Sequence, residues 1–219
     1  KEGRKEELTF MDKTGIWTIK PTQECWDVTG AKPVSVRWVD TDKNWMAEGD
    51  WEPLVRCRLV ARDFKGKDNH RDDLFAETPP LKCKRIILSR AATRRTDGRY
   101  RKVMFIDARK AHLNPKCEDD VYIELPEECG LGKEWCGKLN YWLYGFRPAA
   151  AAWEKHYSGL LEEVGFERGN ACGVIFYHEE RDISLAVHGD DFTFCGLEED
   201  LMWIQELMRG WFDIKVRAI

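Results

Sequence analysis

Three aspartates in the second half of the chain have residue types and spacing suited to binding metal ions. Asp107 closes a hydrophobic segment, and Asp190 and Asp191 follow Gly189 in a short connection between two further hydrophobic segments. Adjacent carboxylates in a tight turn repel each other unless solvent or a cation screens them. With a third carboxylate from a neighbouring strand end they would form an oxygen-rich site for two hard cations. Two such ions, about 4 Å apart, can activate a 3′ hydroxyl and stabilise a leaving pyrophosphate.

Each of these acids also has an ordinary structural interpretation. Acid-rich turns are common on protein surfaces, so Gly-Asp-Asp alone indicates a surface turn, and Asp107 alone could cap a helix. The run 130–133, Gly-Leu-Gly-Lys, resembles a phosphate loop. It lacks the four-residue spacer and the following Ser or Thr of a P-loop, and is rejected. The metal-site interpretation therefore depends on the elements that position the acids.

The second half of the chain alternates strand and helix patterns. Strands are predicted at 101–107, 121–125, 173–178, 183–188, 192–195 and about 212–216, and helices at 149–164 and about 198–210. In the first helix, Trp153, Tyr157 and Leu161 recur at the spacing of one buried face. This alternation predicts an α+β or α/β sheet with helices on one face, with the acids at strand ends.

The first half of the chain has shorter elements. A helix is predicted at 5–14, strands at 16–19, 34–38 and 54–64, a turn at 42–53, a loop at 65–80 and a helix near 87–92. In the strand at 54–64, Cys57 and Leu59 fall on one face and Arg56 and Arg58 on the other.

The formal charge of −4 conceals an asymmetry along the sequence. Residues 1–110 hold 25 Lys and Arg against 18 Asp and Glu, a net +7, whereas residues 111–219 hold 10 against 21, a net −11. The segment 82–102 has nine basic residues and one acid, Asp97. Such a distribution suits a protein that holds phosphates with one part and metal ions with another, or simply a salt-bridged surface.

The eight cysteines and the hydropathy of the chain indicate the cellular compartment to expect and whether a membrane is involved. No two cysteines form a C-x-x-C pair, which favours reduced, mostly buried thiols in an intracellular protein. The pattern does not resolve a cytoplasmic particle from the nucleus. No apolar run approaches roughly 18 residues, so no membrane partner is expected.

Six segments, taken in order, resemble motifs of copia-type LTR retrotransposon reverse transcriptases. They are RCRLVAR (56–62), LFAETPP (74–80), FIDARKAHLN (105–114), VYIELPE (121–127), LYGFRPA (143–149) with Trp153, and VHGDD (187–191). The resemblance extends from about Lys5 to the end of the chain. The fixed order of six motifs makes it specific, and the chain resembles the reverse transcriptase region of a Pol polyprotein.

The resemblance implies a right-hand polymerase fold, with one reverse transcriptase domain over 1–219. Fingers would occupy about 1–98 and 115–145, and the palm about 99–114 and 146–219. The chain ends soon after the final predicted palm strand, so the thumb is expected to be absent or truncated.

The same resemblance implies an RNA-directed DNA polymerase, a nucleotidyltransferase that joins a dNTP to a primer 3′ hydroxyl. Two Mg²⁺ ions, with Mn²⁺ as an alternative, would bind the catalytic residues Asp107, Asp190 and Asp191. Nucleotide would contact Arg56, Arg58 and His112, and template and primer would contact Tyr144, Gly145 and Arg147. Arginine suits phosphate because its planar fork binds two oxygens. The implied partners are an RNA and DNA template-primer, dNTPs, and the rest of the Pol polyprotein, including integrase and RNase H.

The sequence departs from the family pattern near these motifs, although the three carboxylates are intact. The departures are His112 for Phe or Tyr, Pro148 for Gln, Ala150 and Ala151 for Pro and Arg, His188 for an aromatic residue, and Gly189 for an apolar residue. They leave two alternatives open. One is a catalytically inactive retroelement remnant that acts at most as a nucleic-acid-binding module through 82–102. The other is an RNA-templated RNA polymerase, suggested by Gly189.

Overall fold

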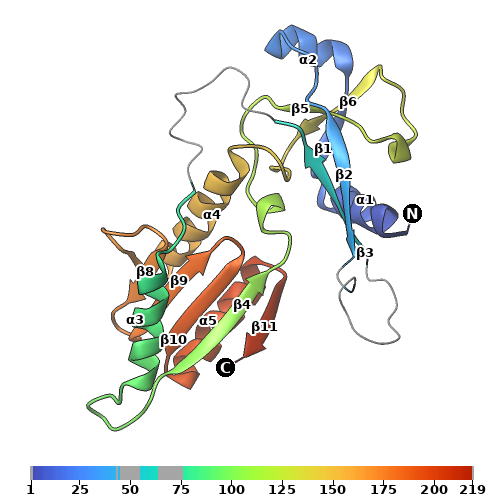
Figure 1. Cartoon of the computed structure of the whole chain (residues 1–219). Helices are drawn as coiled ribbons and strands as arrows, with labels where there is room; N and C mark the ends of the chain where they lie inside the picture. The colour runs from blue at the N-terminus through green and yellow to red at the C-terminus, as the bar shows by residue number, and fades with distance from the viewer. Residues whose placement is uncertain (1, 43, 45–54, 64–75, 219) are drawn as a thin grey trace. The chain divides into compact units, whose positions relative to one another are not determined.

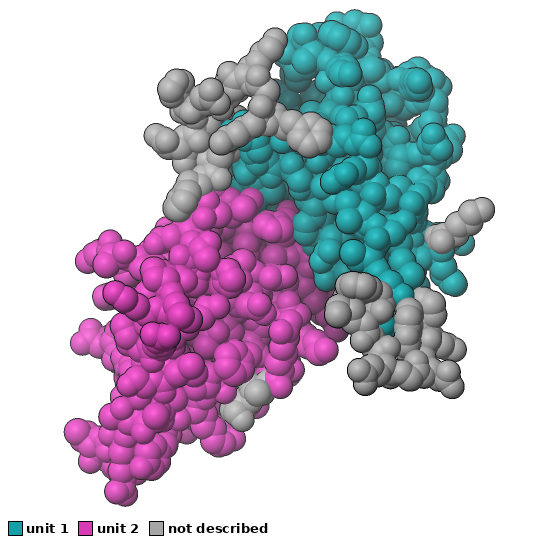
Figure 2. Space-filling view, in the orientation of Figure 1, with its two compact units in different colours: residues 1–74, 115–149 teal, residues 75–114, 150–219 magenta. Residues whose placement is uncertain are grey.

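The computed structural model of the chain describes residues 2–42, 44, 55–63 and 76–218 (Figure 1). The chain divides into two compact units, coloured separately in Figure 2. Unit 1 combines Lys1–Leu74 with Pro115–Ala149, and unit 2 combines Phe75–Asn114 with Ala150–Ile219. Both units mix helices and strands, which confirms the α+β composition predicted from the sequence.

Unit 2 is built on a six-stranded antiparallel sheet in the order β11-β4-β10-β9-β8-β7. Its strands are β4 (Lys102–Ala108), β7 (Glu167–Arg168), β8 (Ile175–His178), β9 (Ile183–His188), β10 (Asp191–Gly196) and β11 (Ile214–Ala218). Its helices are α3 (Leu81–Ala92), α4 (Ala149–Glu163) and α5 (Glu198–Trp211), with a short 3₁₀ helix η2 (Ala111–Leu113). Every helix and strand predicted in this part of the chain is present, with ends shifted by a few residues.

Helices cover both faces of this sheet. Side chains alternate along a strand, so Met104 and Ile106 of β4 enter the main core, which α4 and α5 cover with Trp153 and Leu201. On the opposite face, Ile87 of α3 forms a second buried cluster with Ala186 of β9 and Cys195 of β10. Figure 1 shows α3 and α5 on opposite faces of the sheet. The expectation of helices on one face was therefore wrong, because β9 buries five of its six side chains and needs cover on both sides.

The described residues of unit 1 form two smaller sheets and two α-helices. One sheet has the order β1-β6-β5, from β1 (Trp17–Pro21), β6 (Trp135–Leu139) and β5 (Tyr122–Glu124), and the other pairs β2 (Val36–Asp42) with β3 (Val55–Ala61). The helices are α1 (Glu2–Thr14) and α2 (Thr22–Thr29), with a short 3₁₀ helix η3 (Glu127–Cys129). On β3, Cys57 and Leu59 are buried while Arg56 and Arg58 are half-buried, so the predicted two faces are confirmed.

Two elements of unit 1 were not predicted. Helix α2 buries only Cys25, so it has no apolar stripe to reveal it. Strand β6 contains Gly137, a residue that weakens strand patterns. An added Cβ there would lie 3.0 Å from the Trp17 ring, so the close approach of β1 explains the glycine.

Two predicted segments fall mainly on residues outside the described ranges. They are the turn at 42–53 and the loop at 65–80. Among the described residues, no helix combines the length and apolar character that a membrane crossing requires.

Candidate active site

A tight hairpin turn in unit 2 carries two of the three predicted acids. Strand β9 ends at His188 and β10 begins at Asp191, leaving Gly189 and Asp190 as the turn. Gly189 has φ +64°, the left-handed backbone that the first residue of a primed hairpin turn adopts and that glycine tolerates best. The buried Trp153 indole Nε1 donates a 2.8 Å hydrogen bond to the Gly189 carbonyl. The turn is thus anchored to α4, and the glycine has a local structural cause.

The third acid lies directly opposite this hairpin. Asp107 of β4 and Asp191 of β10 are Cα partners in the antiparallel ladder. The Ala108 backbone N–H donates to the Asp190 carbonyl at 2.9 Å, which ties the turn to the end of β4. Like charges directly opposite each other destabilise a sheet. The fold therefore brings Asp107 close to Asp190 and Asp191, which follow it by 83 and 84 positions in the sequence. The repulsion between these carboxylates has an electrostatic cost that a cation can offset.

An arginine that the sequence reasoning missed supplies a positive charge there. Arg217 of β11 places its Nη2 atom 3.1 Å from Asp107 Oδ2 and 3.7 Å from Asp191 Oδ1. The hydrogen bond to Asp107 and the charges of Asp107 and Asp191 raise the pKa of Arg217 above its ordinary value. The alternation of β11, with Ile214 and Val216 packed on the core, placed Arg217 on the face of the acids. No feature of the sequence identified β4 as the strand next to β11.

The acids differ in exposure, and their side chains do not close around a common point. The Asp107 side chain is 23% exposed and that of Asp191 is 52% exposed. Within residues 2–42, 44, 55–63 and 76–218, no group of three or more His, Cys, Asp or Glu side chains is arranged to hold a metal ion. The structure brings the backbones of the three predicted residues together, whereas a shared ion would require their carboxylates to converge further.

A cavity of about 300 Å³ lies beside Asp191, on the face of the sheet against which α3 packs. Its lining is part apolar and part basic: Lys84, Leu88, Phe105, Asp191, Phe192, Thr193 and Arg217. The Lys84 Nζ atom lies 3.4 Å from Nδ1 of His188, so α3 contacts the strand end next to the turn. Cationic side chains from α3 and β11 thus flank the exposed acid.

In unit 1, the predicted nucleotide and template residues meet at the end of β3. The Arg58 guanidinium carbon lies 5.8 Å from the centroid of the Tyr144 ring, within cation–π range. The Ala61 N–H donates to the Tyr144 carbonyl at 2.7 Å. An added Cβ on Gly145 would lie 2.3 Å from the Ala61 carbonyl oxygen, so only glycine fits.

Arg147, two residues after Gly145, makes a further contact with the segment that follows β3. Its backbone N–H donates to Asp63 Oδ2 at 3.1 Å. The motifs at 56–62 and 143–149 are therefore joined by the main-chain bond between Ala61 and Tyr144, and the Asp63 side chain, just after the first motif, adds a contact to the second. Arg56 is half-buried on the same face of β3 as Arg58.

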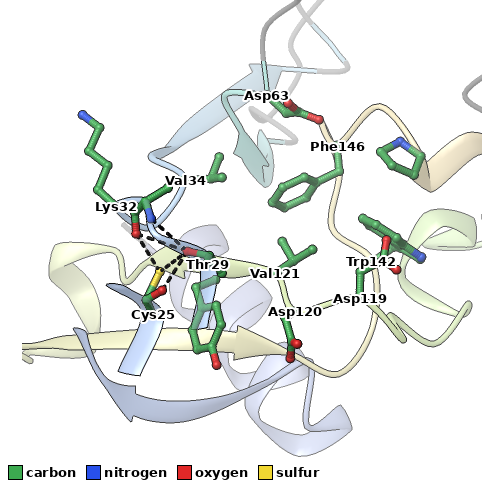
Figure 3. A pocket seen from close by; sticks show the side chains of 13 residues that line it. Cys25, Thr29, Lys32, Val34, Asp63, Asp119, Asp120, Val121, Trp142 and Phe146 are labelled. Carbon is green, nitrogen blue, oxygen red and sulfur yellow. Dashed lines mark hydrogen bonds between the residues drawn. The ribbon is translucent and has the colours of Figure 1, made fainter. Parts of the chain in front are cut away.

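Unit 1 also has a pocket of about 230 Å³ next to these motifs (Figure 3). Aromatic, acidic and small residues line it, among them Cys25, Lys32, Val34, Asp63, Asp119, Asp120, Val121, Trp142, Phe146 and Pro148. Phe146 and Val121 face each other across it in Figure 3. Trp142 is 5% exposed, so it belongs to the core of unit 1.

His112 lies in unit 2, in η2 just after β4. Its neighbours Ala111 and Leu113 are buried, and His112 itself is half-buried. Lys110 precedes this turn with φ +52°, an uncommon backbone conformation for a residue with a side chain. The backbone conformation of Lys110 therefore sets the direction in which the chain leaves Asp107.

Internal ion pairs neutralise much of the basic segment 82–102. Arg90, Arg95 and Arg101 all bind the carboxylate of Asp182. Arg99 pairs with Asp97 and Glu199, and Lys102 pairs with Glu198. Five of the nine cations are thus paired within unit 2. The basic segment therefore offers nucleic acid far less free charge than its composition indicates.

Comparison with known proteins shows which family the chain resembles. Residues 23–218 match the family model described as reverse transcriptase (RNA-dependent DNA polymerase). The chain is 26% identical, over 205 residues, to the "Retrovirus-related Pol polyprotein from transposon TNT 1-94" of Nicotiana tabacum. The alignment covers 90% of this chain and 14% of that polyprotein, so the chain spans a small part of this relative's length. These matches confirm the resemblance found in the sequence, and the chain belongs to the reverse transcriptase (RNA-dependent DNA polymerase) family.

Proposed function

We propose that the chain is the polymerase region of a retrotransposon Pol polyprotein, with Asp107, Asp190 and Asp191 as its catalytic carboxylates. The observation that carries the proposal is the pairing of Asp107 with Asp191 across adjacent strands, with Asp190 in the turn between β9 and β10. The reaction would be transfer of a nucleotide from a dNTP to the 3′ hydroxyl of a primer on an RNA template.

In chemical type the three carboxylates suit two Mg²⁺ ions, with Mn²⁺ as a substitute, once their side chains converge on the ions. Carboxylate oxygens are the ligands that these hard ions prefer. Asp107 and Asp191 already share one positive charge, that of Arg217, which indicates that this strand edge favours a cation. Bound there, the ions would lower the pKa of the attacking hydroxyl and neutralise charge on the leaving group. The protein itself fixes the acids: the ladder positions Asp107 and Asp191, and Trp153 anchors the turn.

Unit 2 would be the palm and unit 1 the fingers of a right-hand polymerase. The two units have nearly the bounds implied by the resemblance, apart from residues 75–98, which group with the six-stranded sheet through α3. In this proposal Arg56 and Arg58 bind the triphosphate of the incoming nucleotide. Arginine suits this role because it binds phosphate oxygens in pairs.

Tyr144, Gly145 and Arg147 would contact template and primer, and His112 would contact the sugar of the nucleotide. The main-chain bond between Ala61 and Tyr144 supports a joint role for the two motifs, because it couples the template segment to the basic strand. The remaining partners in this proposal are the RNA and DNA template-primer and the other parts of the polyprotein, including integrase and RNase H, in an intracellular setting.

A primer-extension assay tests the catalytic assignment. It would use an RNA template, a DNA primer, dNTPs and Mg²⁺, with the 219-residue chain and with a longer piece of its polyprotein. Asp107→Asn and Asp190→Asn should each lower extension by about 10³-fold or more, because several kcal/mol of transition-state stabilisation are lost. Asp213→Asn is the matched control, since this exposed acid pairs with Arg109 outside the site. Its rate should stay within about twofold of wild type.

Two outcomes would contradict the proposal. One is extension by Asp190→Asn at the wild-type rate. The other is the absence of extension by the longer piece while it binds primer-template, which would favour an inactive remnant. Incorporation of NTPs in preference to dNTPs would instead favour an RNA polymerase.

A further inference from the structure

We infer that Arg217 is a built-in competitor of divalent cations, whose guanidinium occupies the Asp107–Asp191 edge and sets the metal concentration that this edge requires. The inference rests on the proposed function, because it takes these acids as metal ligands. It adds a residue outside the six motifs and assigns it a regulatory effect on ion binding.

The first support is that one guanidinium nitrogen serves both acids. Arg217 Nη2 lies 3.1 Å from Asp107 Oδ2 and 3.7 Å from Asp191 Oδ1. A divalent ion bound to the same oxygens would take up their lone pairs and repel the guanidinium. Arg217 and the ion therefore cannot share these atoms, and occupancy by one lowers occupancy by the other.

The second support is an irregularity in the backbone at Arg217, which lies on the face of the acids. The pairing of β11 with β4 is regular from Ile214 to Val216 and then shifts, so that Ala218 pairs with Phe105 and Arg217 is the extra residue. A bulge of this kind redirects a side chain. Here the side chain at the bulge contacts Asp107 on the adjacent strand β4 and Asp191 on β10 beyond it.

The third support is that displacing the Arg217 side chain from the acids costs little free energy and that a cavity beside it can hold the displaced side chain. The Arg217 side chain is 54% exposed, so its ion pairs are screened by water. It also lines the cavity of about 300 Å³ with Phe105 and Thr193, which gives the released guanidinium room. An exposed pair contributes up to roughly fivefold in affinity. With two acids engaged, the competition should be several-fold and not all-or-none.

Direct measurement of Mn²⁺ binding by electron paramagnetic resonance of the free ion tests this without an activity assay. Arg217→Gln should lower the Kd for Mn²⁺ by about 3-fold to 10-fold relative to wild type. Arg109→Gln is the matched control, because it removes the same charge nearby but pairs with Asp213. Its Kd should change by less than about twofold. Far-UV circular dichroism would check that each variant is folded.

A second measurement uses the wild-type protein and so does not depend on a variant folding. Phenylglyoxal modifies accessible arginines, and cleavage before aspartate gives a peptide 213–219 in which Arg217 is the sole arginine. Saturating Mn²⁺ should increase modification of Arg217 several-fold. The peptide 107–118 contains only Arg109 and is the internal control, which Mn²⁺ should leave unchanged.

The outcomes separate this inference from the proposed function. If Asp107→Asn binds Mn²⁺ as tightly as wild type, the metal site itself is wrong. If Asp107→Asn loses Mn²⁺ binding but Arg217→Gln binds no tighter than wild type, the metal site stands and competition by Arg217 is wrong. Unchanged modification of Arg217 on addition of Mn²⁺ would also overturn the competition.

Discussion

Asp182 gathers three arginines that are spread over twelve positions of the sequence. Arg90, Arg95 and Arg101 all bind its carboxylate, and the Tyr177 hydroxyl donates to it at 3.1 Å. The side chain is only 19% exposed. Burial alone would raise the pKa of Asp182, but the hydrogen bonds and charges of Arg101, Tyr177 and Arg90 hold it below its ordinary value. This one residue ties α3 and the segment after it to the β8–β9 hairpin.

Asp182→Asn should therefore destabilise the protein by about 2 kcal/mol, because three arginines lose their counter-charge in a partly buried place. The pKa of this acid is lower in the folded protein than in the unfolded chain. Its contribution is thus present above the unfolded pKa, near 4, and is lost as pH falls through the folded pKa. Urea unfolding between pH 3 and 7 would show a smaller acid-induced loss of stability in Asp182→Asn than in wild type.

Glu206→Gln is the control variant for Asp182→Asn. Glu206 pairs with Arg209 on the surface of α5 and is 65% exposed. Exposed pairs contribute little, so this change should alter stability by less than about 0.5 kcal/mol. Equal losses in the two variants would contradict the assignment of Asp182 as a central anchor.

At the level of elements, the turn between β9 and β10 makes a separate prediction. An added Cβ at Gly189 meets nothing within 4 Å, so the cost of Gly189→Ala comes from the φ of +64° alone. That cost is about 1 kcal/mol. Gly159→Ala, in the middle of α4 and equally free of contacts, should instead stabilise by up to about 1 kcal/mol. Thermal unfolding of both variants measures the two opposite shifts.

If Gly189→Ala were neutral, the glycine would need a different explanation from backbone conformation. The observed φ accounts for this departure from the family pattern without invoking an RNA polymerase. Gly189→Ala should also lower primer extension, because it displaces Asp190, and should raise the Mg²⁺ concentration that extension requires.

The elements of unit 2 could be predicted because their apolar residues recur with regular spacing. Trp153, Tyr157 and Leu161 of α4 are all buried, as the spacing required. Elements with little buried surface, such as α2, carry no such pattern. The adjacency of Asp107 and Asp191 was expected from the order of the motifs. It could not be predicted from the alternation of side chains within each strand, because alternation does not reveal which strands are neighbours. Arg217 was missed for that reason.

At the scale of the whole molecule, all eight cysteines lie among the described residues and are free thiols. The six that are buried are Cys25, Cys57, Cys117, Cys136, Cys172 and Cys195, and the two that are half-buried are Cys83 and Cys129. Burial raises the pKa of Cys117 and of Cys172 to about 11, which keeps these thiols protonated near neutral pH. Mostly buried thiols were predicted from the sequence, and their burial is confirmed.

Titration with a thiol-specific disulfide reagent at pH 8 should therefore show at most two fast-reacting groups in the native protein and eight in denaturant, because the thiolate is the nucleophile and access is limited. Cys83→Ser combined with Cys129→Ser should remove the fast phase. More than two fast groups in the wild-type protein would show that a buried part of either unit opens readily.

The order of β4 in the sheet has a consequence for synthesis of the chain. β4 lies between β10 and β11, yet its partners begin at Asp191 and Ile214, more than 80 residues later. A nascent chain therefore carries β4 with both edges unpaired while the ribosome makes α4, β8 and β9. Unpaired strand edges invite association with other chains. Slow translation of this stretch should raise the demand for chaperones, and Asp107 acquires its neighbours among the last events of folding.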